Sequence, residues 1–161
     1  MARTGKKAIF KGRKRKITLL ILIILFAAVQ FYRPHKNIQK VATKKDFLSY
    51  EKAPENVANL IKNSCYDCHS DYTDYYWYDH IAPASWFVDN HIKEGKEHLN
   101  LSKWSIKDYR DKRSYLSQMA SMIKENKMPL PSYTLVHPKS KLSDTEKQQI
   151  IDWLFTIEVK R

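Results

Sequence analysis

The spacing of apolar residues predicts helices along most of the chain. Within 116–123 and again within 150–157, apolar side chains recur at positions i, i+3, i+4 and i+7, which is the period of one helix face. We expect the first of these helices to cover about 105–126. The second is expected to begin at Ser143, because Ser143 and Glu146 have the types and spacing of a capping box.

Two further helices are predicted from weaker patterns. One begins at Pro54, which suits the first turn of a helix, and its apolar face continues to Ser64, directly before a pair of cysteines. The other begins near 83–85. The segment 128–141, before the last helix, contains three prolines and is not expected to be a helix interior. No segment alternates as a strand does, so the predicted fold class is all-α.

An uncharged apolar run, ITLLILIILFAAVQFY, precedes these helices. It covers 17–32 and follows sixteen residues that contain eight lysines and arginines and no acid. A basic segment before an apolar one is typical of a signal-anchor or a signal peptide. We predict a retained transmembrane anchor over 17–33, because AAV at 27–29 makes a poor cleavage site. A cleaved peptide and a buried core helix are the alternatives, and the run is short for a span, which needs about 20 residues.

The net charge of +12 does not indicate a nucleic-acid partner once its distribution is considered. Eight of the 29 lysines and arginines lie in 1–16, which leaves 21 basic residues against 17 acidic ones in the rest of the chain. The positive-inside rule accounts for the basic segment and predicts that it stays in the cytoplasm. Two cysteines cannot form a disulfide scaffold, and three glycines are few for a fold rich in β-turns.

The sequence CYDCH, residues 65–69, is the most specific chemical signal in the chain. It uses both cysteines, Cys65 and Cys68, and places His69 directly after them. C-x-x-C-H is the attachment sequence of a c-type haem. Two thiols three residues apart on a helical turn can each form a thioether with one vinyl group of a porphyrin, and the next histidine can then coordinate the iron. We therefore predict one covalent haem c, with His69 as the proximal ligand.

Three other kinds of cysteine site are the alternatives. A thioredoxin-like dithiol has no use for the adjacent histidine and needs a βαβ unit, which is not predicted here. A structural zinc site needs four ligands, and although His80, His91 and His98 could contribute, no second close pair of thiols exists. A disulfide between cysteines three residues apart would be strained.

The distal ligand of the iron is predicted to be Met128, with His91 as the alternative. Met128 stands about sixty residues after His69, directly before Pro129 and ahead of the last helix, where a small class I cytochrome c has its methionine. Prolines limit the freedom of such a loop, so ordering it costs less entropy. The side chains considered for this position are Met119, Met122, Met128, His80, His91, His98 and His137.

Aromatic residues are numerous, with ten tyrosines, six phenylalanines and four tryptophans. Each of them can bury a large apolar area. Because the domain has few aliphatic residues, we expect four aromatic side chains to wall the porphyrin: Tyr76, Trp77, Trp86 and Trp104. Ordinary core or surface packing is the alternative for each. Trp153 lies on the capped helix and is expected to pack between helices.

Several spaced segments of the chain resemble the bacterial haem-binding domain family. After CYDCHS, these are YYWY, IAPASW, HLNLSKW, MPLPSY and LSDTEKQQIIDW, in the order found in that family, together with His91 and Gly95. The resemblance covers about residues 50–157. The family has an arginine-like position after Gly95, and this chain has Lys96 there, which weakens any contact to a haem propionate.

The resemblance implies one haem, held covalently by Cys65, Cys68 and His69, in a small exported domain of a kind sometimes associated with cytochrome c peroxidases. The implied fold is a class I cytochrome c-like helical domain. The predicted order along the chain is a basic cytoplasmic tail at 1–16, an anchor at 17–33, a linker at 34–53 and the haem domain at 54–161.

The predicted function is single-electron transfer by a membrane-anchored monohaem cytochrome. Two protein ligands leave no open iron position for a substrate, so we expect an electron carrier and not an enzyme. The expected partners are redox proteins such as a cytochrome c peroxidase or a respiratory complex, with the haem domain in the periplasm at a bacterial inner membrane. The alternatives are a peroxidase-associated or gas-sensing haem domain with a displaceable distal ligand, and a membrane-anchored interaction module without haem.

Overall fold

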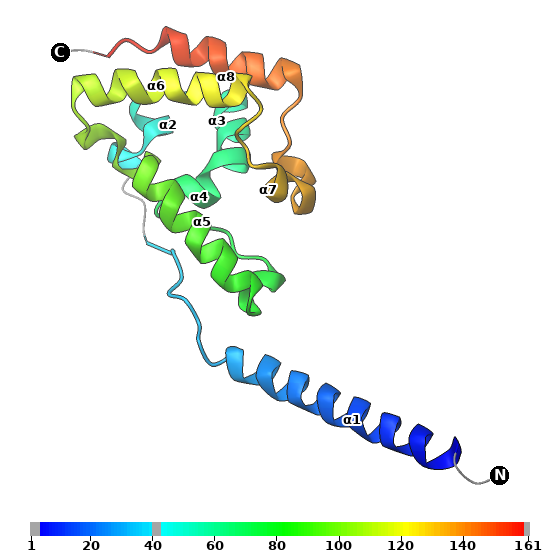
Figure 1. Ribbon diagram of the computed structural model, residues 1–161. Coiled ribbons are helices and arrows are strands. Elements are labelled where there is room, and N and C mark those ends of the chain that lie inside the picture. Colours follow the sequence, from blue (N-terminus) through cyan, green and yellow to red (C-terminus); the bar gives the residue numbers. More distant parts are fainter. Residues whose placement is uncertain (1–3, 40–42, 160–161) are drawn as a thin grey trace. The chain divides into compact units, whose positions relative to one another are not determined.

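In the computed structural model, the described residues are 4–39 and 43–159, and most of them are helical (Figure 1). Within these ranges, β-structure is limited to an isolated antiparallel bridge between Ile38 and Tyr72. The prediction of an all-α fold is therefore confirmed for the described part of the chain. Two compact units are present: Met1–His35 with Tyr75–Asp89, and Lys36–Asp74 with Asn90–Arg161.

The first unit contains the long helix α1 (Thr4–Val29), the short 3-10 helix η3 (Trp77–His80) and the beginning of α5 (Ala84–His98). The end of α1 is joined to the second segment of this unit by specific contacts. The Gln30 side-chain amide donates to the Ala82 carbonyl at 3.1 Å and accepts from the Ala82 N–H at 2.9 Å. The Trp86 indole donates to the Tyr32 carbonyl at 3.0 Å.

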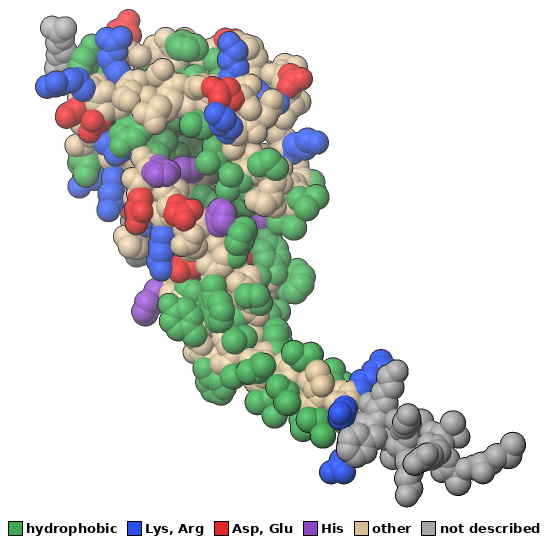
Figure 2. Space-filling view, viewed as in Figure 1, with side chains coloured by type: hydrophobic (Ala, Val, Ile, Leu, Met, Phe, Trp, Pro, Cys, Tyr) green, Lys and Arg blue, Asp and Glu red, His purple; other side chains and the backbone are tan. Residues whose placement is uncertain are grey.

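The apolar residues of α1 are exposed around the helix, from Ile17 at 49% to Phe26 at 53% (Figure 2). The helix ends at Val29, so the predicted segment 17–33 is not helical to its end, and its helical apolar part is roughly 20 Å long. Among the helices of the described residues, none has both the length and the apolar character that crossing a membrane requires.

The second unit carries the remaining helices. In chain order they are η1 (Thr43–Lys45), α2 (Phe47–Tyr50), α3 (Glu55–Ile61), η2 (Lys62–Tyr66), α4 (Asp67–His69), α5 from Asn90, η4 (Leu101–Ile106), α6 (Tyr109–Lys124), α7 (Pro131–Val136), η5 (Pro138–Ser140) and α8 (Asp144–Thr156). Helices α6 and α8 lie side by side, and α8 also packs against α3 (Figure 1).

The ends of these helices are set by side-chain caps. The predicted capping box of α8 is present: the Ser143 N–H donates to Glu146 at 2.7 Å, and the Ser143 hydroxyl accepts from the Glu146 N–H at 3.3 Å. Helix α6 begins at Tyr109, later than predicted, because Asp108 caps it by accepting from the Asp111 N–H at 2.9 Å. Pro131 stands in the first turn of α7, where the missing N–H costs no helical hydrogen bond.

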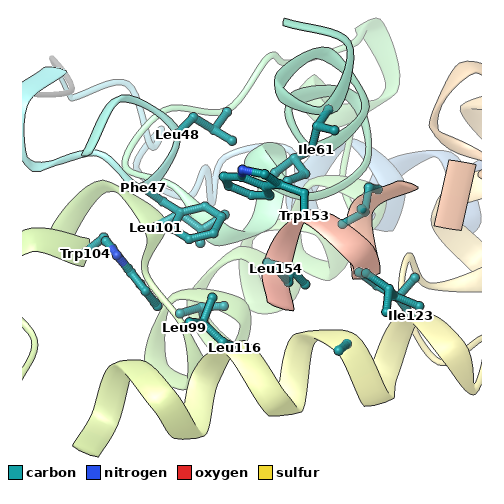
Figure 3. Packing of buried hydrophobic residues seen from close by; sticks show 14 of the residues in the cluster. Phe47, Leu48, Ile61, Leu99, Leu101, Trp104, Leu116, Ile123, Trp153 and Leu154 are labelled. Atoms are coloured by element: carbon teal, nitrogen blue, oxygen red, sulfur yellow. The ribbon is translucent and has the colours of Figure 1, made fainter. Parts of the chain in front are cut away.

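The core of the second unit is built around Phe47, which is fully buried between two tryptophans (Figure 3). The centre of its ring lies 4.7 Å from the centre of the Trp104 ring and 5.3 Å from that of the Trp153 ring, and both pairs are edge-to-face. The predicted apolar faces of α6 and α8 close this core. Phe47 and Leu48 lie in the segment that we predicted as a linker, 34–53, so that part of it belongs to the core.

Candidate functional site

The CYDCH sequence lies at the end of one nearly continuous helical stretch, 55–69. Helix α3 leads into the π-helical turn η2, which holds Cys65, and then into α4, which holds Cys68 and His69. Such wide turns inside helices are frequent at functional sites. The turn is fixed from outside, since the buried Ser64 hydroxyl donates to the Ser140 carbonyl at 3.0 Å.

The His69 ring is oriented by a backbone carbonyl. Its Nδ1 lies 3.0 Å from the Leu99 oxygen. A carbonyl only accepts, so Nδ1 carries the proton and Nε2 keeps its lone pair. Burial lowers the His69 pKa and outweighs the hydrogen bonds to the Leu99 and Gly95 carbonyls, which act in the opposite direction. The result is a neutral imidazole with Nε2 available to a metal.

The two cysteines are reduced thiols that are not joined by a disulfide, and both are half-buried. Burial, and to a smaller extent the nearby Cys68, raises the pKa of the Cys65 thiol to about 12. At neutral pH Cys65 is therefore protonated.

The residues between the cysteines anchor the motif on two sides. The Tyr66 hydroxyl donates to both carboxylate oxygens of Asp46, at 2.9 and 3.0 Å, and the Tyr133 hydroxyl donates to Oδ2 of Asp67 at 2.6 Å. Burial raises the pKa of both phenols, and the carboxylates that they bond raise it further, so both remain donors. Neither pair was predicted, because the partners are 20 and 66 positions apart in sequence.

Gly95 allows α5 to lie directly against the motif. A Cβ added to Gly95 would stand 2.7 Å from the Cys68 carbonyl oxygen and 3.3 Å from the Cys68 Cβ. A backbone carbonyl cannot swing aside as the end of a long side chain can. Only glycine therefore permits this close approach.

Two hollows open beside the motif in the second unit. The first, of about 270 Å³, lies among the motif, the α5 residues His91, Glu94 and Gly95, and the segment 128–130. The second, of about 330 Å³, lies between the motif and α6, and Leu99, Tyr115 and Met119 form part of its wall. Both hollows share Ser64, Cys65, His69, His98 and Met128.

The structure thus brings together Cys65, Cys68, His69, Met128 and His91, which the sequence predicted for the site. His98, one of the side chains considered for the distal position, lines both hollows, whereas His91 lines the first. Sequence reasoning missed several wall residues of the two hollows, among them Ser64, Asp67, Glu94, Leu99, Tyr115 and Tyr133.

Of the four aromatic residues predicted for the haem pocket, one lies in the core of the second unit and three lie in the first unit. Trp104 is fully buried against Phe47, and it lines neither of the two hollows. Trp104 is a large, fully buried side chain of the core. Tyr76, Trp77 and Trp86 belong to the first unit, where Trp77 is 75% exposed. Their contact with a porphyrin stays a prediction.

Lys96, the residue at the arginine-like family position, is engaged in a local network. Its ammonium lies 2.8 Å from the Asp71 carboxylate and donates to the Asn37 side-chain oxygen at 2.6 Å. Asn100 also donates to Asp71, at 2.8 Å. These contacts tie Lys96 of α5 to residues on both sides of the motif, and they satisfy its charge without a haem propionate.

The chain matches a known protein family. The family described as "Haem-binding domain" matches residues 24–156, most of the chain. The chain belongs to this haem-binding domain family. Comparisons with curated proteins and with solved structures found no match.

The donor atoms of this haem-binding domain fit a haem. The motif supplies two thiols and a neutral imidazole nitrogen to the same hollow, and Met128, a residue type whose thioether ligates haem iron, lines it as well. Over the described residues, no group of three or more His, Cys, Asp or Glu side chains is arranged to hold a metal ion.

Proposed function

We propose that this haem-binding domain is a monohaem c-type cytochrome that carries single electrons. The observation that supports the proposal is the convergence of Cys65, Cys68 and His69 on one hollow that Met128 also lines. A bound haem would supply a one-electron change of its iron between the ferrous and ferric states. The chain supplies attachment, axial ligands and an apolar surrounding.

Attachment uses the two cysteines as thiols. Each thiol would add across one vinyl group of a bound haem: the sulfur would bond to the carbon next to the porphyrin ring, and the thiol hydrogen would go to the terminal carbon. No electrons are gained or lost, and no group leaves, so the step needs reduced thiols and no oxidant. Cys65 and Cys68 meet this condition, because neither is in a disulfide.

The axial ligands would be His69 and Met128. The Leu99 carbonyl holds the proton of His69 on Nδ1 and so directs Nε2 toward the metal. Met128 is half-buried and lines both hollows, and its N–H bonds the Met122 carbonyl at 3.2 Å, which fixes the backbone where α6 ends. Two protein ligands that stay in place in both redox states favour electron transfer over substrate chemistry.

The alternative is a haem domain with a displaceable distal ligand, associated with a peroxidase or a gas sensor. One observation favours it: His91 and Glu94 line the same hollow as Met128 and could provide polar groups on the distal side. His91 could also replace Met128 as the ligand.

The location and partners form a separate part of the proposal, which rests on the sequence. The basic segment 1–16 and the apolar run after it are the grounds for proposing attachment to a bacterial inner membrane, with the haem domain in the periplasm. The proposed partners are redox proteins at that membrane, such as a cytochrome c peroxidase or a respiratory complex.

Replacement of Met128 tests the carrier function. We expect the ferric wild-type protein to show the near-infrared charge-transfer band of sulfur bonded to iron, and the ferrous protein to bind carbon monoxide slowly. Met128→Ala should abolish the band and speed the binding. Met122→Ala is the matched control, because Met122 lines the second hollow and is 39% exposed. Rapid carbon monoxide binding by the wild type would instead support the gas-sensing or peroxidase alternative.

A further inference from the structure

The short helix α7 is held against the haem motif through Tyr133. Its hydroxyl donates to Oδ2 of Asp67 at 2.6 Å, and its side chain lines the same hollow as Met128. Other side chains of α7 face solvent: Leu135 is 81% exposed and Val136 is 56% exposed. Within α7, Tyr133 therefore makes the hydrogen bond to the motif, and η5, which follows α7, is joined to the motif by the Ser64–Ser140 bond.

A stiff segment joins Tyr133 to Met128. The Leu130 carbonyl accepts from the N–H groups of Tyr133 and Thr134, each at 3.0 Å, and the Met128 N–H bonds back to Met122 at the end of α6. Pro129 and Pro131 restrict the backbone between them. A displacement of Tyr133 is therefore transmitted to Met128 with little room for the intervening residues to absorb it.

Asp67 is a fixed anchor on the motif side. Its Oδ1 accepts from the Asp74 N–H at 3.0 Å, and its carbonyl accepts from the Thr73 hydroxyl at 2.5 Å. Asp67 is also the direct neighbour of Cys68 in the chain. The carboxylate that receives the Tyr133 hydrogen bond is thus tied to the backbone that carries the haem-attachment residues.

We propose that Tyr133 is a positioning residue whose hydrogen bond to Asp67 keeps Met128 at the distal coordination position. The inference rests on the proposed ligation by Met128 and deepens it by naming the contact that maintains it. A hydrogen bond to a carboxylate is stronger than one between neutral groups, and its geometry is restrictive. Its loss removes the hydrogen bond between α7 and Asp67 and weakens the hold on the Met128 side chain, while the Met128 backbone stays bonded to Met122.

Tyr133→Phe is the test, and Tyr66→Phe is its matched control. Both changes remove one phenol hydroxyl that bonds a carboxylate at the motif and leave the ring in place. Tyr66 bonds Asp46, the residue that caps α2, and not the segment next to Met128. The measurements are the near-infrared sulfur-to-iron band, the carbon monoxide association rate of the ferrous protein, and amide hydrogen exchange across 130–136.

For Tyr133→Phe we expect the band to weaken, carbon monoxide to bind about tenfold faster or more, and the 130–136 amides to exchange faster, since a hydrogen bond to a charged group is lost. Tyr66→Phe should leave the exchange of the 130–136 amides as in the wild type, because its hydroxyl bonds Asp46 and not a residue next to α7. Equal behaviour of Tyr133→Phe and wild type, or equal changes in both variants, would overturn the inference.

The two levels of the proposal fail in different ways. A wild-type protein without the sulfur-to-iron band refutes Met128 ligation and, with it, the role of Tyr133. A wild-type band that persists unchanged in Tyr133→Phe refutes the role of Tyr133 alone. If Tyr133→Phe does not accumulate folded, Asp67→Asn is measured against the same criteria, because it weakens the same bond from the acceptor side.

Discussion

The two sides of the site are built differently. The motif side, with Cys65, Cys68 and His69, ends a helical stretch whose apolar face, including the fully buried Ile61, rests on the central core. The side of Met128 is a proline-containing segment followed by α7, whose outer side chains are exposed. The difference indicates that the covalent and proximal attachments rest on the global fold, whereas the distal ligand depends on a few local hydrogen bonds.

The largest expected effect comes from the core beneath the motif. Phe47→Ala should lower the free energy of unfolding by about 3–5 kcal/mol, because it removes a fully buried ring between two tryptophans and leaves a cavity. Leu135→Ala on α7 is the contrasting variant and should change it by less than about 0.5 kcal/mol. Chemical denaturation of both measures the difference, and similar losses would remove the distinction between the two sides.

Gly95→Ala tests the close contact between α5 and the motif. The added methyl would meet the Cys68 carbonyl, so we expect a loss of about 1–3 kcal/mol in the free energy of unfolding. Gly12→Ala is the control, since nothing lies within 4 Å of its added Cβ. It should be neutral or slightly stabilising, because alanine is the better helix former. A neutral Gly95→Ala would show that α5 does not approach Cys68 as closely as described.

The smallest expected effect concerns the cap of α8. Ser143→Ala removes the hydroxyl that accepts from the Glu146 N–H, and we expect a loss of about 1 kcal/mol in the free energy of unfolding. Haem content and the sulfur-to-iron band should not change, because α8 contributes to the core and its cap does not line either hollow. Ser132→Ala, at an exposed position of α7, is a suitable comparison and should be near neutral.

Local sequence signals predicted the parts of the molecule that local chemistry decides. The capping box at Ser143, the apolar faces of α6 and α8, and the C-x-x-C-H spacing each involve residues within eight positions of one another. The segment around Phe47 was missed because α2 is four residues long, too short for a helical period to be visible. Trp104 was assigned to the haem pocket because residue type alone does not show which aromatic ring fills the core.

Contacts between distant parts of the sequence could not be predicted in this way. The Asp67–Tyr133 and Tyr66–Asp46 pairs depend on how helices meet in three dimensions, and the π-helical turn at Cys65 leaves no periodic signal in so few residues. The predicted membrane span at 17–33 was inferred from the apolar run. The helix ends at Val29, and no helix of the described residues is both long and apolar enough to cross a membrane.

The most direct test of the account is the mass and the alkaline pyridine spectrum of the denatured protein after production in a host that attaches haem c. The account predicts one haem per chain that survives acid extraction, with the spectrum of two thioether bonds. Cys65→Ser and Cys68→Ser should each shift that spectrum toward a single thioether, and the double variant should lose the covalent haem. A wild-type chain with the mass of the bare polypeptide would contradict the account.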